Sequence, residues 1–247
     1  MAEHAVPTPA DRPADLPIDA PADPPNDPPN DPPIDDAFSD LPDTARRIVR
    51  AAVDAFATRG FHATTTRDIA TGAGLSPAGL YVHYPSKAAV LGEVSRLGHE
   101  RALALVQAAL TGSGTSSRAR IATLVADFVS WHAHHHTTAR VVQYELAALQ
   151  PPDRQVVATL RRRIESLVEE EVRRGLARGE LTVGQPHAVT RALLSLCVDV
   201  ARWYDPAGRE PPQQVADLYA TLVLRMLGAD APGLPADAPT AATTEDR

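Results

Sequence analysis

The chain of 247 residues contains a single cysteine, Cys197, which excludes an internal disulfide framework. Aromatic residues make up only 4% of the sequence, whereas alanine, leucine, valine and arginine are abundant, a balance that favours helices over strands. No uninterrupted apolar run reaches the roughly 18 residues that a membrane-spanning helix requires. The N-terminus has neither the basic segment nor the apolar segment of a secretory signal. These absences predict a cytoplasmic protein with no membrane partner.

The net charge of −7 is unevenly distributed along the chain. Residues 1–43 carry eleven acidic side chains and one basic side chain, whereas residues 44–91 carry six basic and two acidic side chains. The remaining residues, 92–247, are nearly balanced. Phosphate contact depends on local rather than overall charge, so a compact basic segment beside an acidic tail is compatible with a nucleic-acid partner.

The first 43 residues repeat an Asn-Asp-Pro-Pro unit and contain few apolar side chains. Proline removes backbone donors, the acidic groups repel one another, and too little apolar surface is available to offset the entropy of ordering. We therefore expect residues 1–43 to form a disordered tail, and residues 229–247 to form a second one. The N-terminal tail either has no specific role or competes electrostatically with DNA for the neighbouring basic segment.

Between the tails, apolar residues recur at intervals of three and four, as on one face of a helix. The first helix is predicted from Thr44 to Gly60, because glycine is common just past a helix end. Strand-like alternation is missing, which predicts an all-α fold class. The further helices are expected at about 66–73, 77–83, from Ser86 onward, and at about 118–136, 139–149, 153–178, 187–204 and 211–228.

The segment after the first helix carries the local signals of a helix-turn-helix. Thr66 is a suitable N-cap, Asp68 complements the helix dipole in the first turn, and Gly74 permits a sharp turn. Ser76 caps the second helix and Pro77 occupies its first position, where the missing amide hydrogen has no cost. Two short helices joined by such a turn form a helix-turn-helix.

The second short helix has an inner face and an outer face. Leu80 and Tyr84 can face inward, and the outer face then carries Ala78, Gly79, Tyr81 and His83. Small residues at its start allow the backbone to approach the major groove closely. The side chains of Tyr81, His83 and Lys87 carry groups that can reach phosphates and base edges.

The string from Thr64 to Lys87 resembles the DNA-binding signature of the TetR family. Its Gly-x-x-x-x-Thr, Ala-x-x-Ala-Gly-x-Ser and Leu-Tyr-x-His-aromatic elements follow the family's order and spacing. The resemblance implies a three-helix DNA-binding domain at 44–91, followed by a helical ligand-binding and dimerisation domain at 92–228. It implies DNA contacts at Thr66, Ser76, Pro77, Ala78, Gly79, Tyr81, His83 and Lys87. Further phosphate contacts from the first helix are expected at Arg46, Arg47 and Arg50.

By this resemblance, the protein is a transcriptional repressor that binds a pseudo-palindromic operator in double-stranded DNA as a homodimer. A small-molecule effector would release it. The family places dimerisation on the last two helices, although their apolar stripes could equally be ordinary protomer core. The stripe residues proposed for the dimer interface are Leu193, Leu196, Val200, Leu218, Leu222 and Met226.

Parts of the C-terminal half, around 144–146, 201–208 and 224–228, are similar to TetR regulators that sense CoA thioesters. This similarity implies an acyl-CoA-like or other hydrophobic effector. The candidate pocket residues are Trp131, Arg140, Tyr144 and Trp203. For Trp203, a hydrophobic cap at a helix end is the competing interpretation.

Two other residue patterns suggest chemistry of a different kind. The histidines at 132 and 134–136 could bind a metal, but no Asp, Glu or Cys lies nearby, so we expect a polar helix end and no metal. Cys197 is expected to be buried and inert. No catalytic constellation or phosphate loop is present, which predicts a protein that is not an enzyme and has no cofactor. A DNA-binding protein without an effector is the second hypothesis, and a C-terminal domain with no cavity would favour it.

Overall fold

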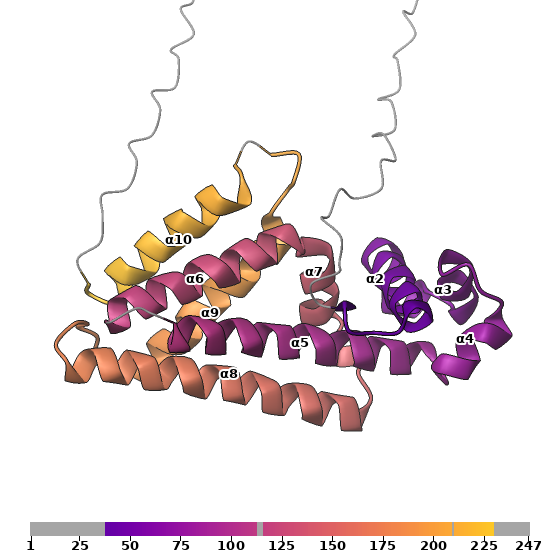
Figure 1. The fold of residues 1–247 in the computed structure, drawn as a ribbon, viewed down its shortest axis with the longest axis horizontal. Coiled ribbons are helices and arrows are strands. Elements are labelled where there is room, and N and C mark those ends of the chain that lie inside the picture. Colours follow the sequence, from indigo (N-terminus) through magenta and orange to yellow (C-terminus); the bar gives the residue numbers. More distant parts are fainter. Residues whose placement is uncertain (1–37, 113–115, 209, 230–247) are drawn as a thin grey trace, which may run out of the picture. The chain divides into compact units, whose positions relative to one another are not determined.

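The computed structural model describes residues 38–112, 116–208 and 210–229. Within these ranges the regular elements are all helices (Figure 1). The predicted all-α fold class is therefore confirmed. None of the helices in these ranges is long and apolar enough to cross a membrane.

Most residues of the two predicted tails lie outside the described ranges. Some residues before 44 nevertheless belong to the folded part, because the side chain of Phe38 is buried and the first long helix starts at Asp43. Phe38 packs into the same core as that helix. The predicted tail boundary at residue 43 is therefore too late by several residues.

The N-terminal part of the described chain consists of α2 (Asp43–Ala63), α3 (Thr66–Gly72) and α4 (Pro77–His83). Ile69 of α3 and Leu80 of α4 are fully buried against the apolar face of α2. That face consists of Ile48, Val49, Ala52, Val53 and Phe56. Its spacing of three and four residues explains why α2 is helical and why the two shorter helices pack across it.

Gly60 interrupts α2 rather than ending it. Its φ of 75° lies in the left-handed region, which glycine adopts without steric cost, and one more helical turn follows at Phe61–Ala63. The hydroxyl of Thr64 then donates to the carbonyl of Gly60 at 2.8 Å and to that of Ala55 at 3.0 Å. These bonds fix the direction in which the chain leaves α2 for α3.

The rest of the described chain packs around a second core, to which α5, α6, α8, α9 and α10 contribute. The helix α10 lies along α6, and α8 runs beside α5 (Figure 1). The core centres on Val106, Leu124, Val125, Val168, Leu193 and Val200. The element bounds are α5 Lys87–Thr111, α6 Ser117–His134, α7 His136–Tyr144, η1 Leu146–Ala148, α8 Pro151–Ala177, α9 Pro186–Trp203 and α10 Pro212–Met226.

Two predicted helix boundaries are wrong. The helix expected from residue 153 begins at Pro151, because the two prolines occupy its first turn, where a missing amide hydrogen leaves no bond unmade. The helix expected at 139–149 is instead α7 followed by the short 3-10 turn η1. Glu145 lies between them, and its carboxylate accepts a hydrogen bond from the Phe61 amide of α2 at 3.0 Å.

The short helix α7 connects the two cores. Val141 and Val142 belong to the N-terminal core, whereas Ala139 packs against Trp131 of α6. Gly98 of α5 allows the close approach of α7, since a Cβ at that position would lie 2.8 Å from a methyl group of Val142. A shift of α7 would therefore disturb packing in both parts of the chain.

An ion pair with a fully buried carboxylate joins α6 to α8. The guanidinium of Arg120 donates to Glu171 Oε1 from Nη2 at 2.6 Å and from Nε at 3.0 Å, and Arg174 donates to the second carboxylate oxygen. Burial alone would raise the pKa of Glu171, but the hydrogen bonds from Arg120 and Ser117 hold it below its usual value. Each oxygen of this buried charge therefore has a cationic donor.

Candidate nucleic-acid interface

The N-terminus of α3 is closed by a capping box formed by Thr65 and Asp68. The Thr65 hydroxyl accepts from the Asp68 amide at 3.2 Å, and the Asp68 carboxylate accepts from the Thr65 amide at 2.8 Å. The hydrogen bonds from the Thr65 amide and hydroxyl, with a smaller contribution from Arg59, lower the pKa of Asp68. The prediction of Thr66 as N-cap is therefore wrong by one residue, which leaves its side chain available for another contact.

The turn between α3 and α4 is held from α2. Gly74 has a φ of 65°, and Arg47 donates from its guanidinium to the carbonyl oxygens of Ala73 and Gly74. Glycine is needed at position 74 for this backbone angle, and a Cβ there would lie 2.8 Å from Arg47 Nη2 and displace the end of that side chain from the turn. Arg47, expected to be a phosphate contact, instead braces this turn.

The helix α4 forms as predicted at its N-terminus. The Ser76 hydroxyl accepts from the Gly79 amide at 3.1 Å, and Pro77 occupies the first helical turn. Leu80 is fully buried and anchors α4 to the core, while Ala78 and His83 are exposed. A single buried side chain thus orients a helix whose other face is open to solvent.

Two exposed side chains dominate the outer face of α4. Tyr81 is 52% exposed and Val82 is 81% exposed. The Tyr81 hydroxyl lies 3.2 Å from the Thr66 hydroxyl of α3, so the two predicted contact residues form one hydroxyl pair. Sequence reasoning did not select Val82, because an isolated valine gives no signal until its exposure is known. An exposed valine at this position can contact a thymine methyl group.

Lys87, at the first position of α5, has a defined structural role. Its Nζ donates to the carbonyl oxygens of Phe61 at 2.7 Å, His62 at 3.1 Å and Thr64 at 2.6 Å, and lies 4.5 Å from the centre of the Phe61 ring. An ammonium group has three donor hydrogens, so all of them are used within the protein. This geometry disfavours the predicted direct contact of Lys87 with DNA.

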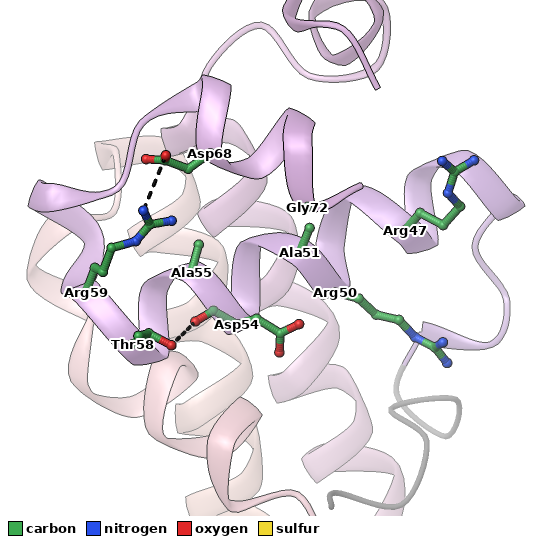
Figure 2. Close-up of a pocket in the computed structure, with 9 residues that line it drawn as sticks. All are labelled: Arg47, Arg50, Ala51, Asp54, Ala55, Thr58, Arg59, Asp68 and Gly72. Carbon is green, nitrogen blue, oxygen red and sulfur yellow. Dashed lines mark hydrogen bonds and ion pairs between the residues drawn. The ribbon is translucent and has the colours of Figure 1, made fainter. Parts of the chain in front are cut away.

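An open groove of about 540 Å³ lies between α2 and α3 (Figure 2). Figure 2 shows Arg59 directed toward Asp68, to which it is paired at 3.3 Å, while Ala51 points toward Gly72. The groove is lined by Arg47, Arg50, Ala51, Asp54, Ala55, Thr58, Arg59, Asp68 and Gly72. Outside it, the predicted phosphate contact Arg46 is paired with Asp43. The Arg59–Asp68 pair joins α2 to α3, whereas the Arg46–Asp43 pair lies within α2.

The residues predicted for a dimer interface fall into two groups. Leu196 of α9 and Leu222 of α10 are 45% and 42% exposed, and Leu218 and Met226 are half-buried. Leu193 and Val200 are instead fully buried in the core of the single chain. Assigning those two residues to an interface is therefore wrong, because their side chains already contact their own protomer on every side.

The four predicted pocket residues are not gathered in one enclosed place. Trp131 is buried, whereas Arg140 is exposed and Tyr144 is 55% exposed. Trp203, also largely exposed, stacks on Tyr219 of α10 with ring centres 6.3 Å apart. Of the four, only Trp131 contacts the interior of the C-terminal helices, where it packs against Ala139 and Ala201.

The histidine-rich segment is not the polar helix end that was predicted. His132, His135 and His136 are buried, and only His134 is exposed. Burial lowers the pKa of His132 to about 4. Within the described ranges, no three His, Cys, Asp or Glu side chains are arranged to hold a metal ion. Cys197 is buried as well, and its burial raises the pKa of the thiol to about 12.

Comparison with known proteins places these features in a family. Residues 48–94 match the family described as bacterial regulatory proteins, tetR family, and residues 114–227 match the tetracyclin repressor-like C-terminal domain. The HTH-type transcriptional repressor KstR2 of Rhodococcus jostii (strain RHA1) is 30% identical over 178 residues, which cover 70% of this chain and 85% of that protein.

Solved structures show the same fold. A tetR-family regulatory protein from Rhodococcus RHA1 is 34% identical, with a TM-score of 0.73 over 77% of this chain and all of that one. AibR, solved in complex with isovaleryl coenzyme A and operator DNA, has a TM-score of 0.68 over 76% of this chain and all of that one, at 19% identity. The helix-turn-helix, the helical domain behind it and these similarities lead to one conclusion: the chain belongs to the TetR family of transcriptional regulators.

Proposed function

We propose that the protein is a homodimeric repressor that binds operator DNA through α3 and α4 and leaves it when a small molecule binds among α5–α10. The observation that carries this proposal is the exposed face of α4, where Tyr81 and Val82 project from a helix that is anchored by Leu80. Adjacent apolar and aromatic side chains exposed on so short a helix provide a contact surface for a partner. The repressor names of relatives such as KstR2 support the direction of regulation.

Each exposed group of the helix-turn-helix then has a specific role at DNA. The small residues Ala78 and Gly79 allow the N-terminal turn of α4, with Ser76 and Pro77, to lie close to the major groove. The hydroxyl pair of Thr66 and Tyr81 donates to a phosphate, and His83 reaches a phosphate or base edge. Val82 contacts a thymine methyl group.

Lys87 and Arg47 act on DNA binding indirectly. Lys87 holds the end of α2 against the start of α5, and Arg47 holds the turn before α4, so both determine where the recognition helix points. Arg46, beside Asp43, and Arg50, which lines the groove between α2 and α3, remain candidates for phosphate contacts from α2. Positioning of this kind matters because groove contacts require defined side-chain geometry.

Dimerisation through α9 and α10 would present two copies of α4 to one duplex. The partly exposed leucines Leu196 and Leu222, with Leu218 and Met226, provide the apolar surface for this contact. Two recognition helices related by a two-fold axis match a pseudo-palindromic operator whose half-sites are about one helical turn apart.

A route from effector to DNA runs through α7. Glu145, at its C-terminal end, accepts from the Phe61 amide at 3.0 Å, directly beside the kink at Gly60. A hydrophobic effector that moves α7 therefore changes the position of the last turn of α2. An acyl-CoA is one candidate, because AibR has the same fold and is found with isovaleryl coenzyme A. The effector acts only through its different affinity for the two arrangements.

The experiment that tests this function first selects operator fragments by binding to the full chain, and then measures affinity by fluorescence anisotropy. Tyr81→Ala is expected to weaken operator binding by about 10-fold or more, the equivalent of one lost hydrogen bond with its packing. Val156→Ala is the control, since Val156 is also a large exposed side chain but lies on α8. Equal effects of both variants, or a protein that is only monomeric in sedimentation, would contradict the proposal.

A further inference from the structure

The interior between α5, α6 and α7 contains polar side chains without partners. Ser95 Oγ, His99 Nε2, Trp131 Nε1 and Thr138 Oγ1 have no hydrogen-bond partner in the protein, and each of these residues is more than nine-tenths buried. Buried polar groups in folded proteins are nearly always satisfied, because leaving one unpaired costs free energy. Several such atoms in one region therefore indicate that something else binds there.

The hydrogen bonding of His99 reveals the chemical character of its free nitrogen. His99 Nδ1 lies 2.7 Å from the Ser95 carbonyl oxygen, which can only accept, so Nδ1 carries the proton. Burial lowers the pKa of His99 to about 4, and the imidazole is therefore neutral near pH 7. The unpartnered Nε2 is consequently a hydrogen-bond acceptor that lies inside the protein.

His132 of α6 makes the same Nδ1 contact as His99. Its Nδ1 lies 2.7 Å from the Phe128 carbonyl oxygen, which leaves Nε2 with the lone pair. His99 and His132 are close enough for the charge of one to lower the pKa of the other. The charged or titratable neighbours that affect this pair are Arg161 of α8 and His135 at the end of α6, and both also favour the neutral imidazoles.

Thr138 reaches the same region from α7. It lies four residues before Val142, so the two share the helix face that contacts Gly98 of α5. Gly98 is next to His99 in the sequence. The Thr138 hydroxyl is thus a third polar group, able to donate or accept, on the side of α7 that faces the two histidine-bearing helices. Trp131 adds an N–H donor at the edge of this region, beside Ala139.

We infer that Ser95, His99, His132 and Thr138 form the polar end of the effector site and bind the hydroxyl group of a neutral, otherwise apolar alcohol. This inference rests on the proposed function, and among hydrophobic effectors it chooses a neutral alcohol rather than an acyl-CoA, whose phosphate groups are charged. The apolar body of the alcohol would lie against Trp131 and its neighbours, and its hydroxyl would donate to an imidazole Nε2 while accepting from a serine or threonine hydroxyl.

Other functional groups fit this set of atoms less well. A carboxylate has no hydrogen to give the imidazole acceptors, and its charge would be buried without a cationic partner in the set. An ether or a ketone accepts from Thr138 or Trp131 but leaves the lone pair of His99 unmatched. A hydroxyl both donates and accepts, and therefore satisfies both kinds of group at once.

The binding test uses the full-length protein with two series of probes that differ only in the polar group. One series is decanol, decyl methyl ether and decanoate, and the other is decalol, methoxydecalin and decalin carboxylate. Calorimetry is expected to show that at least one alcohol binds at least about tenfold more tightly than its ether and its carboxylate. If neither alcohol binds more tightly than its ether, the inference is overturned.

Thr138→Val tests the site without relying on the choice of probe. Because the hydroxyl has no protein partner, its replacement by an isosteric methyl is expected to leave the melting temperature unchanged or higher, while alcohol affinity falls about tenfold. Thr111→Val is the matched control, since the exposed Thr111 hydroxyl only bonds carbonyls of its own helix, and it should leave alcohol affinity unchanged. A lower melting temperature for Thr138→Val would show that its hydroxyl is structural and would overturn the assignment.

The same samples separate this inference from the proposed function. Operator affinity of the unmodified protein is measured without any probe. If the protein binds its operator but does not distinguish alcohols from ethers, only the alcohol site is refuted. If it binds no DNA, the repressor function is refuted, whatever the probes do.

Discussion

The N-terminal helices and the C-terminal helices use polar groups in opposite ways. Around α2–α4, Lys87 satisfies three carbonyl oxygens, Arg47 braces the turn before α4, and Thr65 and Asp68 satisfy each other's amides. Between α5, α6 and α7, by contrast, the polar atoms of His99 and Thr138 have no partner in the protein. The groups that position α4 find their partners within the protein, whereas those between α5, α6 and α7 need a further molecule.

This difference corresponds to the two tasks of a regulator. Groove contacts need a rigid, pre-organised surface, and each internal hydrogen bond around α4 limits how its side chains can move. A sensing region must instead be stabilised by its ligand, because an effector shifts a population only by the free energy it contributes to one state. Unsatisfied polar groups lower the stability of the ligand-free interior, so a ligand that pairs with them can stabilise one state of the protein.

The largest predicted effect is a loss of stability at acid pH, caused by the buried histidines of the interior. Burial lowers the pKa values of His99 and His132 to about 4, so the folded chain cannot take up protons that the unfolded chain binds below about pH 6.5. Stability due to these groups is therefore complete above about pH 6.5 and is lost as the pH falls toward 4. At about pH 5 the loss is roughly 2 kcal/mol per histidine, measured by urea unfolding.

Substitution shows whether these histidines cause the effect. His99→Phe and His132→Phe should each remove about half of the loss in unfolding free energy between about pH 7 and pH 5, and the double variant should remove both halves. The comparison uses the change with pH, so any packing difference that is constant with pH cancels. Equal pH dependence in the double variant and the unmodified protein would assign acid sensitivity to other groups.

A smaller effect is expected from the N-terminal region, where Lys87 can be tested. Lys87→Met keeps the aliphatic chain but removes the ammonium from the carbonyls of Phe61, His62 and Thr64, and should lower the unfolding free energy by about 3 kcal/mol. Operator affinity should fall because α4 is less well held. A lysine that acts only by positioning leaves the slope of log K against log salt unchanged.

The competing role for Lys87 has a distinct signature in the same titration. A direct phosphate contact, as the sequence pattern predicts, would reduce the salt slope by about 0.9 when the charge is removed. Arg46→Met is the comparison variant. Arg46 is a candidate phosphate contact, so its loss should reduce the salt slope, but it pairs with Asp43 and does not touch the carbonyls that Lys87 holds. A reduced salt slope for Lys87→Met with an unchanged unfolding free energy would show that Lys87 contacts DNA directly and does not position α4.

The helix-turn-helix could be predicted from sequence because its signals are local. Ser76, Pro77 and Gly74 act on their own backbone, and their roles depend on neighbours within a few residues. The N-cap of α3 was misplaced because adjacent threonines offer the same hydroxyl, and only the bond to Asp68 identifies Thr65. Family spacing likewise placed Lys87 at a DNA-contact position but could not reveal three carbonyls brought together by tertiary structure.

The C-terminal half was less predictable because its chemistry depends on which helix faces meet. Periodicity indicates that Leu193 and Leu196 lie on an apolar stripe, but not that the first is buried in the protomer while the second is exposed. The histidines at 132, 135 and 136 suggested a solvated end for the same reason. Histidine is a polar residue type, so the sequence predicts that it is exposed. Buried polar residues that break this expectation are often found at functional sites.

The smallest expected effect, and the one that tests the link between the two regions, is at Glu145. Glu145→Ala removes the acceptor of the Phe61 amide, which should lower the unfolding free energy by about 1–2 kcal/mol and speed hydrogen exchange at that amide. Glu170→Ala, an exposed carboxylate on α8, is the control and should change neither quantity. If α7 transmits effector binding through this bond, the Glu145 variant still binds the operator, but the effector changes operator affinity less than in the unmodified protein. The reason is that coupling between two sites must pass through physical contacts between them. Unchanged exchange at Phe61 would mean that the kink at Gly60 holds itself, and the two regions would then have to communicate through packing, either of Val141 and Val142 or along α5, which contributes to both cores.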